Sequence, residues 1–153
     1  MCIRDRERVC IAVEAIGAVE GILDKTVQYV TERQVFNKSL AAFQNTQFKL
    51  ADCAAELQVY QNFTDTCIQL QAANKLTAVQ ASIAKLKASE MQGKVIDECL
   101  QLFGGYGFMW EYPVARAYAS ARSARIYAGT NEIMKLIITR GLFSEFYQAK
   151  KAK

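Results

Sequence analysis

Apolar residues recur every three or four positions along three long segments of this chain, a spacing that places them on one face of an α-helix. Proline, which ends or bends helices, occurs once in 153 residues, at Pro113. The first segment predicts a helix from about Asp5 to Arg33, the second a helix that ends near Asn74, and the third a helix that ends at a glycine pair. Small residues dominate the first half of the third segment, which favours close helix packing there. The three stripes are Val9, Ala12, Ile16, Val19, Leu23, Val27 and Val30; Phe48, Ala51, Ala55, Val59, Phe63, Cys67 and Leu70; and Ala81, Ala84, Ala88, Met91, Val95, Cys99 and Leu102.

The remaining segments predict a turn and two shorter helices. Asn37 accepts a left-handed backbone, so residues 35–43 are expected to turn between the first two helices. Proline suits the first position of a helix, so Pro113 predicts a short helix through residues 115–125. Thr130 is a good N-cap for a last helix with apolar residues at 133, 136, 137 and 143. Because no long segment alternates apolar and polar residues as a strand does, we expect one all-α domain over residues 1–153. It should be an antiparallel up-and-down bundle of three long helices and two shorter C-terminal ones.

Composition excludes several classes of function. The chain has no histidine, which removes Ser-His and Cys-His catalysis and any histidine-ligated metal site. A net charge of +4 is mild, and the lysines of residues 150–153 are expected to be a solvated end rather than a nucleic-acid site. No apolar run reaches the length of about 20 residues that a membrane span needs, and residues 1–8 do not suggest a signal or transit peptide. The cysteines form no C-x-x-C pair and are expected to be reduced, mostly buried side chains: Cys2, Cys10, Cys53, Cys67 and Cys99.

Four short motifs carry residues suited to ligand binding or catalysis, and each also has a simpler structural interpretation. Gly104-Gly105-x-Gly107 would let the backbone approach a ligand closely, but glycines after a helix usually only end it. Gly129 before Thr130 would leave backbone amides free to attract negative charge, as at any helix N-terminus. Glu7 and Arg33 suit the first and last turns of a helix for reasons of the helix dipole alone. Taken singly, none of these motifs assigns a function.

Taken in order, the motifs resemble the landmarks of one family, the C-terminal helical domain of flavin-dependent acyl-CoA dehydrogenases. The run from Gly107 to Pro113 looks most like the long-chain branch of that family. The resemblance extends from about Asp5 to Phe143. It implies that the N-terminal helical domain and the middle β domain of a complete enzyme are absent from these residues. The landmarks are Glu7-Arg8, Arg33-Gln34-Val35-Phe36, Gln101-Leu102-Phe103-Gly104-Gly105-Tyr106-Gly107-Phe108 and Tyr127-Ala128-Gly129-Thr130-Asn131-Glu132-Ile133.

The resemblance implies a flavin adenine dinucleotide (FAD) cofactor. Arg33 would bind its pyrophosphate, for which the guanidinium fork is well suited, and Phe36 would lie on the adenine side. The family's Phe-Gly-Lys is Phe36-Asn37-Lys38 here, a change that is tolerable if this position needs a left-handed backbone. The Gln-x-x-Gly-Gly segment would lie along the FAD of a neighbouring subunit. The implied cofactor-binding residues are Arg33, Phe36, Gln44, Gln101, Leu102, Phe103, Gly104, Gly105, Thr130, Asn131 and Glu132.

The resemblance also implies the catalytic base. The residue before the glycine of the last motif is often the catalytic glutamate of the family, but here it is Ala128, which cannot remove a proton. Two branches, acting on long-chain and on isovaleryl thioesters, instead carry the base on the first helix in an Asp-x-Glu-Arg segment. Asp5-Arg6-Glu7-Arg8 matches this segment, so Glu7 is the expected base. Asp5, Arg8, Ala128 and Gly129 are the expected substrate-binding residues, and the Ala128 backbone N–H is the expected donor to the thioester oxygen.

The implied reaction is the α,β-dehydrogenation of a fatty acyl-CoA to the trans-2-enoyl-CoA. Electron-transfer flavoprotein is the implied electron acceptor, and a dimer or tetramer with FAD at the subunit interface is the implied assembly. The expected location is the bacterial cytoplasm or the mitochondrial matrix. Two alternatives stay open: a non-catalytic helical module used for oligomerisation, and a relative that dehydrogenates another thioester such as isovaleryl-CoA.

Overall fold

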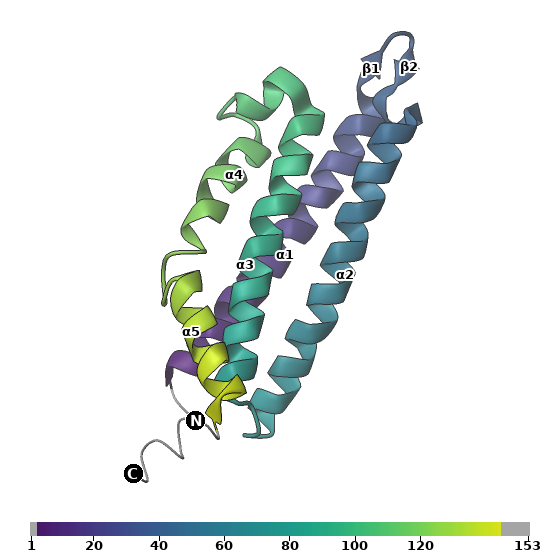
Figure 1. Cartoon of the computed structure of the whole chain (residues 1–153). Coiled ribbons are helices and arrows are strands. Elements are labelled where there is room, and N and C mark those ends of the chain that lie inside the picture. The colour runs from purple at the N-terminus through teal and green to yellow at the C-terminus, as the bar shows by residue number, and fades with distance from the viewer. Residues whose placement is uncertain (1–2, 145–153) are drawn as a thin grey trace, which may run out of the picture.

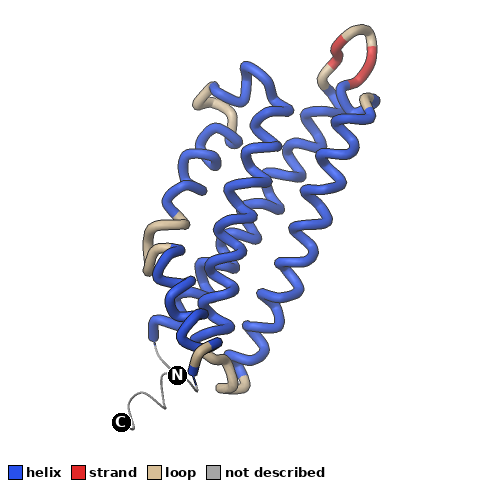
Figure 2. The backbone as a smooth tube through the Cα atoms, viewed as in Figure 1, coloured by secondary structure: helices blue, strands red, loops and turns tan. Residues whose placement is uncertain are grey.

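The computed structural model describes residues 3–144, and within them the chain is almost entirely helical (Figure 2). Three long helices are followed by two shorter ones, so the all-α prediction is confirmed. A two-stranded antiparallel hairpin, too short to leave an alternating pattern, joins the first two helices. The elements are α1 (Ile3–Glu32), β1 (Gln34–Val35), β2 (Lys38–Ser39), α2 (Gln44–Ala72), α3 (Ala78–Phe103), α4 (Pro113–Ser123) and α5 (Asn131–Leu142), with short 3₁₀ segments at Leu40–Ala42 and Gly104–Phe108.

α3 is the central helix of the bundle and packs against α1, α2, α4 and α5. α1 and α3 run in one direction and α2 in the other, as an up-and-down connection requires (Figure 1). α4 and α5 both run opposite to α3 and follow one another along its side (Figure 1). The two short helices therefore occupy together the place of a fourth long helix.

The core has two parts, and small residues build one of them. Alanines on α1 and α3 pack with Cys67 of α2, which lets the two parallel helices approach closely and confirms the packing predicted for the first half of α3. Larger side chains fill the other part, which α1, α2, α3 and α4 share. The small-residue cluster is Val9, Ala12, Ala15, Cys67, Ala81, Ala84 and Ala88. The larger cluster is Ile16, Val19, Ile22, Leu23, Cys53, Met91, Val95, Ile96, Cys99, Phe103, Val114 and Ala121.

The stripe predicted for α2 is wrong over the first half of the helix, whereas in the second half Cys67 is buried and Phe63 packs against the small-residue cluster, as predicted. Phe48 and Val59 are 59% and 65% exposed, and Ala51 and Ala55 are exposed too. The buried residues of this helix are Thr46, Cys53, Thr64 and Cys67, and the buried Thr64 hydroxyl donates to the Tyr60 carbonyl oxygen at 2.8 Å. Apolar residues occur on every side of α2, so their spacing alone fits more than one inward face. On α1 only Val27 departs from the predicted stripe, with 45% exposure.

Most predicted helix ends are confirmed by the backbone. Asn74 follows α2 with a φ of +54°, and Thr130 is the N-cap of α5, accepting a hydrogen bond from the Ile133 N–H at 3.4 Å. Pro113 is the first residue of α4, which ends at Ser123, two residues earlier than predicted. The start of α3 has a capping box formed by Thr77 and Gln80 that sequence analysis did not identify.

The cysteine prediction is confirmed for Cys53, Cys67 and Cys99, which are buried, and it is wrong for Cys10, which is exposed. Cys2 and the lysines of residues 150–153 lie outside the described residues. Within residues 3–144, no helix is both long and apolar enough to span a membrane.

Candidate functional site

A groove of about 640 Å³ lies where α1 and α3 end, at the hairpin end of the bundle. It brings Arg33 together with five other predicted cofactor residues, the whole Gln-x-x-Gly-Gly segment at 101–105, although some seventy positions separate them in the sequence. α1 and α3 are parallel, so their C-terminal ends meet at the same end of the bundle. The groove is lined by Tyr29, Arg33, Val35, Leu40, Gln101, Leu102, Phe103, Gly104, Gly105, Tyr106 and Met109.

Aromatic packing fixes this groove. The ring of Tyr29 on α1 stacks on Phe103 of α3, with centroids 4.1 Å apart, and its hydroxyl donates to the Phe103 carbonyl oxygen at 3.3 Å. Burial raises the pKa of Tyr29, which keeps its hydroxyl a donor. The guanidinium carbon of Arg33 lies 5.5 Å from the centroid of the Tyr106 ring, a cation–π contact on the groove wall. Sequence analysis did not assign Tyr29 or Tyr106 a role.

The glycines of this segment differ in what they do. Gly104 ends α3 with a φ of +58°, where a side chain would be strained. A Cβ added to Gly104 or Gly105 would meet no atom within 4 Å, so both glycines leave open space beside the groove. A Cβ on Gly107 would lie 2.5 Å from the Leu100 carbonyl oxygen, so this glycine is needed for packing.

Phe36 and Gln44 do not line the groove. Phe36 is at the tip of the hairpin, 90% exposed, with a φ of +50°. Asn37 beside it has a φ of +62°. Asparagine adopts this left-handed conformation readily, so it can take the place of the family's glycine here. Gln44 is the first residue of α2 and is exposed. Both predicted cofactor contacts are therefore surface residues near the groove end of the bundle.

A second hollow, of about 530 Å³, holds Glu7 and Ala128 together. These are the two positions at which the family resemblance puts a catalytic base, and they come from opposite ends of the chain. Glu7 is exposed to the hollow, whose other lining is mainly apolar: Ile3, Arg6, Cys10, Ile11 and Tyr127. The Tyr127 hydroxyl donates to Glu14 Oε2 of α1 at 3.4 Å, which ties the loop to the helix that carries Glu7. Burial, and then the charge of Glu14, raise the pKa of Tyr127.

Asp5 and Arg8 do not line this hollow. They form an ion pair of 2.7 Å between Arg8 Nη1 and Asp5 Oδ1 on another side of α1, where the two residues are 7% and 8% exposed. Removing one partner would leave a buried charge unpaired, so the pair is important for the start of α1.

The loop before α5 contains the remaining predicted residues. Ala128 and Gly129 both have a positive φ, +50° and +98°. Thr130, Asn131 and Glu132 line a separate hollow of about 290 Å³ with Arg122, Arg125 and Lys135. Backbone and Thr130 hydrogen bonds at the start of α5 lower the pKa of the exposed Glu132 carboxyl. This hollow also includes Glu90 of α3, which lies about 20 Å before Phe103 at 1.5 Å per residue. The predicted cofactor residues at the start of α5 and those at the end of α3 therefore line separate hollows of one chain.

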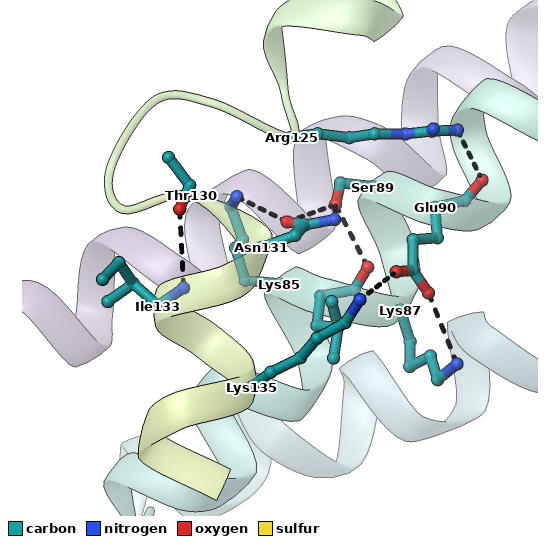
Figure 3. A network of polar contacts seen from close by, with 10 residues as sticks. Lys85, Lys87, Ser89, Glu90, Arg125, Thr130, Asn131, Ile133 and Lys135 are labelled. Carbon is teal, nitrogen blue, oxygen red and sulfur yellow. Dashed lines mark hydrogen bonds and ion pairs between the residues drawn. The ribbon is translucent and has the colours of Figure 1, made fainter.

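Lys85 is a buried residue near this loop that sequence analysis missed. It is fully buried, and its Nζ donates to Asn131 Oδ1 at 2.8 Å (Figure 3). The same Nζ also donates to the Gly129 carbonyl oxygen at 2.9 Å. Burial lowers the pKa of Lys85, and the charge of Glu132 opposes that shift. The one sequence signal was a polar row beside the apolar stripe of α3, formed by Lys85, Ser89 and Gln92, all of them buried.

Known proteins share both the sequence and the fold. The chain is 46% identical over 140 residues to the mitochondrial long-chain specific acyl-CoA dehydrogenase of Mus musculus, covering 92% of this chain and 33% of that protein. It is 39% identical over 137 residues to the short-chain specific acyl-CoA dehydrogenase of Megasphaera elsdenii, covering 90% and 36%. The crystal structure of an acyl-CoA dehydrogenase from Geobacillus kaustophilus superposes with a TM-score of 0.89 at 42% identity, covering 91% and 37%.

The chain spans about a third of the length of these relatives. The family profile described as acyl-CoA dehydrogenase, C-terminal domain, matches residues 4–143. With Glu7 and Ala128 in one hollow and Arg33 beside the Gln-x-x-Gly-Gly segment in another, this chain belongs to the acyl-CoA dehydrogenase family, as a C-terminal domain.

Proposed function

We propose that this chain is the C-terminal domain of an FAD-dependent dehydrogenase that converts a fatty acyl-CoA to the trans-2-enoyl-CoA. The observation that carries the proposal is the hollow shared by Glu7 and Ala128. A carboxylate lies there opposite a loop that carries alanine where the family resemblance puts the alternative base, so only Glu7 of these two residues can accept a proton.

The groove residues fit an FAD cofactor. Arg33 offers a charged fork for a pyrophosphate, and the open space at Gly104 and Gly105 lets a flat ligand reach the backbone. Phe36, exposed at the hairpin tip, is available to a ligand or to a second copy of the chain. When bound, FAD supplies the acceptor for the hydride that leaves the β-carbon of the substrate.

Glu7 would remove the α-proton of the thioester. That proton is acidic enough only if the thioester oxygen is held by hydrogen-bond donors. No backbone carbonyl within residues 3–144 accepts a bond from the Ala128 N–H, which leaves this donor free for the substrate oxygen. The apolar lining of the hollow suits an acyl chain.

Named relatives support a substrate and an electron acceptor for this proposal. The 46% identity to a long-chain enzyme favours a long acyl chain, and isovaleryl-CoA is the alternative because that branch shares the Glu7 position. A relative from Acetobacterium woodii, 34% identical, is named as a subunit of a caffeyl-CoA reductase–Etf complex, which supports electron-transfer flavoprotein as acceptor. Mitochondrial and bacterial relatives support a location in the mitochondrial matrix or the bacterial cytoplasm.

The test uses the full-length protein loaded with FAD. Glu7→Gln should keep the flavin and lose the bleaching of flavin absorbance by acyl-CoA about 10²- to 10⁴-fold, because an amide cannot accept the proton. Glu20→Gln, at an exposed glutamate further along α1, is the matched control. Adding Ala128→Glu to Glu7→Gln should restore part of the rate, since the two positions share the hollow. Bleaching by Glu7→Gln at the rate of the control would reject the assignment.

A non-catalytic oligomerisation module is the second candidate, and exposed aromatic side chains favour it. Phe108 and Trp110, just past the groove, are 90% and 64% exposed. This function predicts that the protein self-associates stably, binds no flavin and shows no bleaching in any variant. The same full-length preparation would show all three properties.

A further inference from the structure

Within residues 3–144, Lys85 is the largest side chain that the fold buries completely. It is not a partner in any ion pair within residues 3–144, and both of its acceptors are neutral oxygens, the Gly129 carbonyl and Asn131 Oδ1. Burying an ammonium group is unfavourable, and a packed apolar side chain of similar volume would often be as stable. Global stability alone therefore does not explain a lysine at this position.

The contacts of Lys85 end on one short loop. Asn131 is 4% exposed, and its Nδ2 donates to Ser89 Oγ at 3.1 Å, which holds the amide facing Lys85 (Figure 3). The Asn131 N–H donates to the Arg125 carbonyl oxygen at 3.1 Å, closing the loop at its base. The two bonds of Lys85 thus fix the C-terminal half of a closed loop that contains Ala128.

That loop needs to be held. Ala128 has a φ of +50°, a conformation that an L-residue other than asparagine or aspartate seldom adopts. Gly129 next to it has a φ of +98°, and a Cβ there would lie 2.9 Å from Met134 Cε, so this side of the loop packs against the Met134 side chain. Strained backbone of this kind persists when surrounding contacts determine it. Lys85 is the buried donor that fixes the Gly129 carbonyl.

We propose that Lys85 is a positioning residue: through Gly129 and Asn131 it holds Ala128 in its left-handed conformation beside Glu7, with the Ala128 N–H free for the carbonyl oxygen of the substrate. The role toward substrate rests on the proposed function. The role toward the loop does not, so the two are tested separately.

The first test measures the loop itself by amide NMR of the 153-residue chain. Lys85→Met keeps the length of the side chain and removes the donor, and Lys87→Met, at an exposed lysine of the same helix, is the matched control. Lys85→Met should shift the Ala128 and Gly129 amide resonances and speed their hydrogen exchange, whereas the control should not. Ser89→Ala, a milder change that frees the Asn131 amide, should produce a smaller change in the same direction and serves if Lys85→Met does not fold. Unchanged Ala128 and Gly129 resonances in a folded Lys85→Met or Ser89→Ala chain would overturn the proposal.

The second test measures the effect on substrate in the full-length, FAD-loaded protein. The probe is a conjugated enoyl-CoA, whose absorbance moves to longer wavelength when its carbonyl oxygen accepts hydrogen bonds. Lys85→Met should lose most of that shift and bind the probe about tenfold more weakly. Its flavin content should equal that of Lys87→Met. A full shift in Lys85→Met would overturn the role toward substrate. If even the unaltered protein gives no shift, the proposed function fails, and the NMR result alone decides the role of Lys85 in the loop.

Discussion

Replacing Arg33 by alanine should weaken FAD binding while leaving the bundle intact. Arg33 follows the last residue of α1, is exposed, and forms no ion pair within residues 3–144. Its side chain contacts the Tyr106 ring at the wall of the groove. A guanidinium held beside open glycine backbone, without a carboxylate partner, is available to an anionic ligand.

The two effects of the substitution differ in size. A charge-assisted hydrogen bond to a pyrophosphate contributes about 1.5–3 kcal/mol, so the dissociation constant of FAD should rise roughly ten- to a hundredfold. An exposed cation–π contact contributes only about 0.5–1 kcal/mol, so the free energy of unfolding should fall by no more than about 1 kcal/mol. Arg33→Lys keeps the charge without the fork and should give an intermediate affinity.

The assay is titration of the full-length apoprotein with FAD, followed by quenching of flavin fluorescence, with urea unfolding of the same samples. Arg140→Ala, at an exposed arginine in the last turn of α5, is the control for loss of a positive charge. FAD affinity of Arg33→Ala equal to that of Arg140→Ala would show that Arg33 is a surface residue without a role in the cofactor site. A loss of affinity together with a large loss of stability would instead assign the effect to the fold.

Two further predictions concern Gly105 and Lys85. Gly105→Val should abolish FAD binding without loss of stability, because the new side chain enters the open groove. Gly107→Ala should instead lower the free energy of unfolding by about 1–3 kcal/mol, because its Cβ meets the Leu100 carbonyl oxygen. Urea unfolding and flavin content would separate the two effects, and equal losses of stability in the two variants would refute the distinction. Burial lowers the pKa of Lys85 in the folded chain below its ordinary value of 10.5. Between the lowered pKa and pH 10.5 the unfolded chain therefore binds more protons than the folded chain, and the free energy of unfolding rises with pH. The free energy of unfolding should therefore rise relative to that of Lys85→Met as the pH approaches 10.5, and parallel pH profiles would contradict the shift.

Local signals in the sequence predicted the helices and most of their ends. Periodicity placed α1 and α3, and Pro113, Thr130 and Asn74 marked boundaries that the backbone confirms. The inward face of the first half of α2 was not predictable in this way, because Phe48 and Val59 repeat with helical spacing and yet face solvent. Only the positions of the neighbouring helices decide which side of such a helix is buried.

The sites depended more on tertiary structure. Local chemistry left the Gly104 motif open between a helix end and a ligand contact, and only the parallel packing of α1 and α3 puts Arg33 beside it. Lysine is ordinarily exposed, and the acceptors that permit burial of Lys85 are on a loop more than forty positions later. No pattern within α3 identifies those acceptors.

The length of α1 bears on how many copies of the chain one active site needs. Glu7 is near the start and Arg33 just after the end of this single helix of 30 residues, which at about 1.5 Å per residue is about 45 Å long. Glu7 and Arg33 of the same chain are too far apart to serve one FAD and the thioester that reacts at its flavin, so the proposed site requires Glu7 from one copy and Arg33 from another. Mixed dimers of Glu7→Gln and Arg33→Ala chains, refolded together at equal ratio, should then contain one site with both residues intact. The mixture should recover acyl-CoA-dependent bleaching that neither variant shows alone at a limiting FAD concentration. Activity of the mixture no higher than the mean of the two variants would mean that each chain builds its site alone, and that the residues at the two ends of α1 do not serve one cofactor.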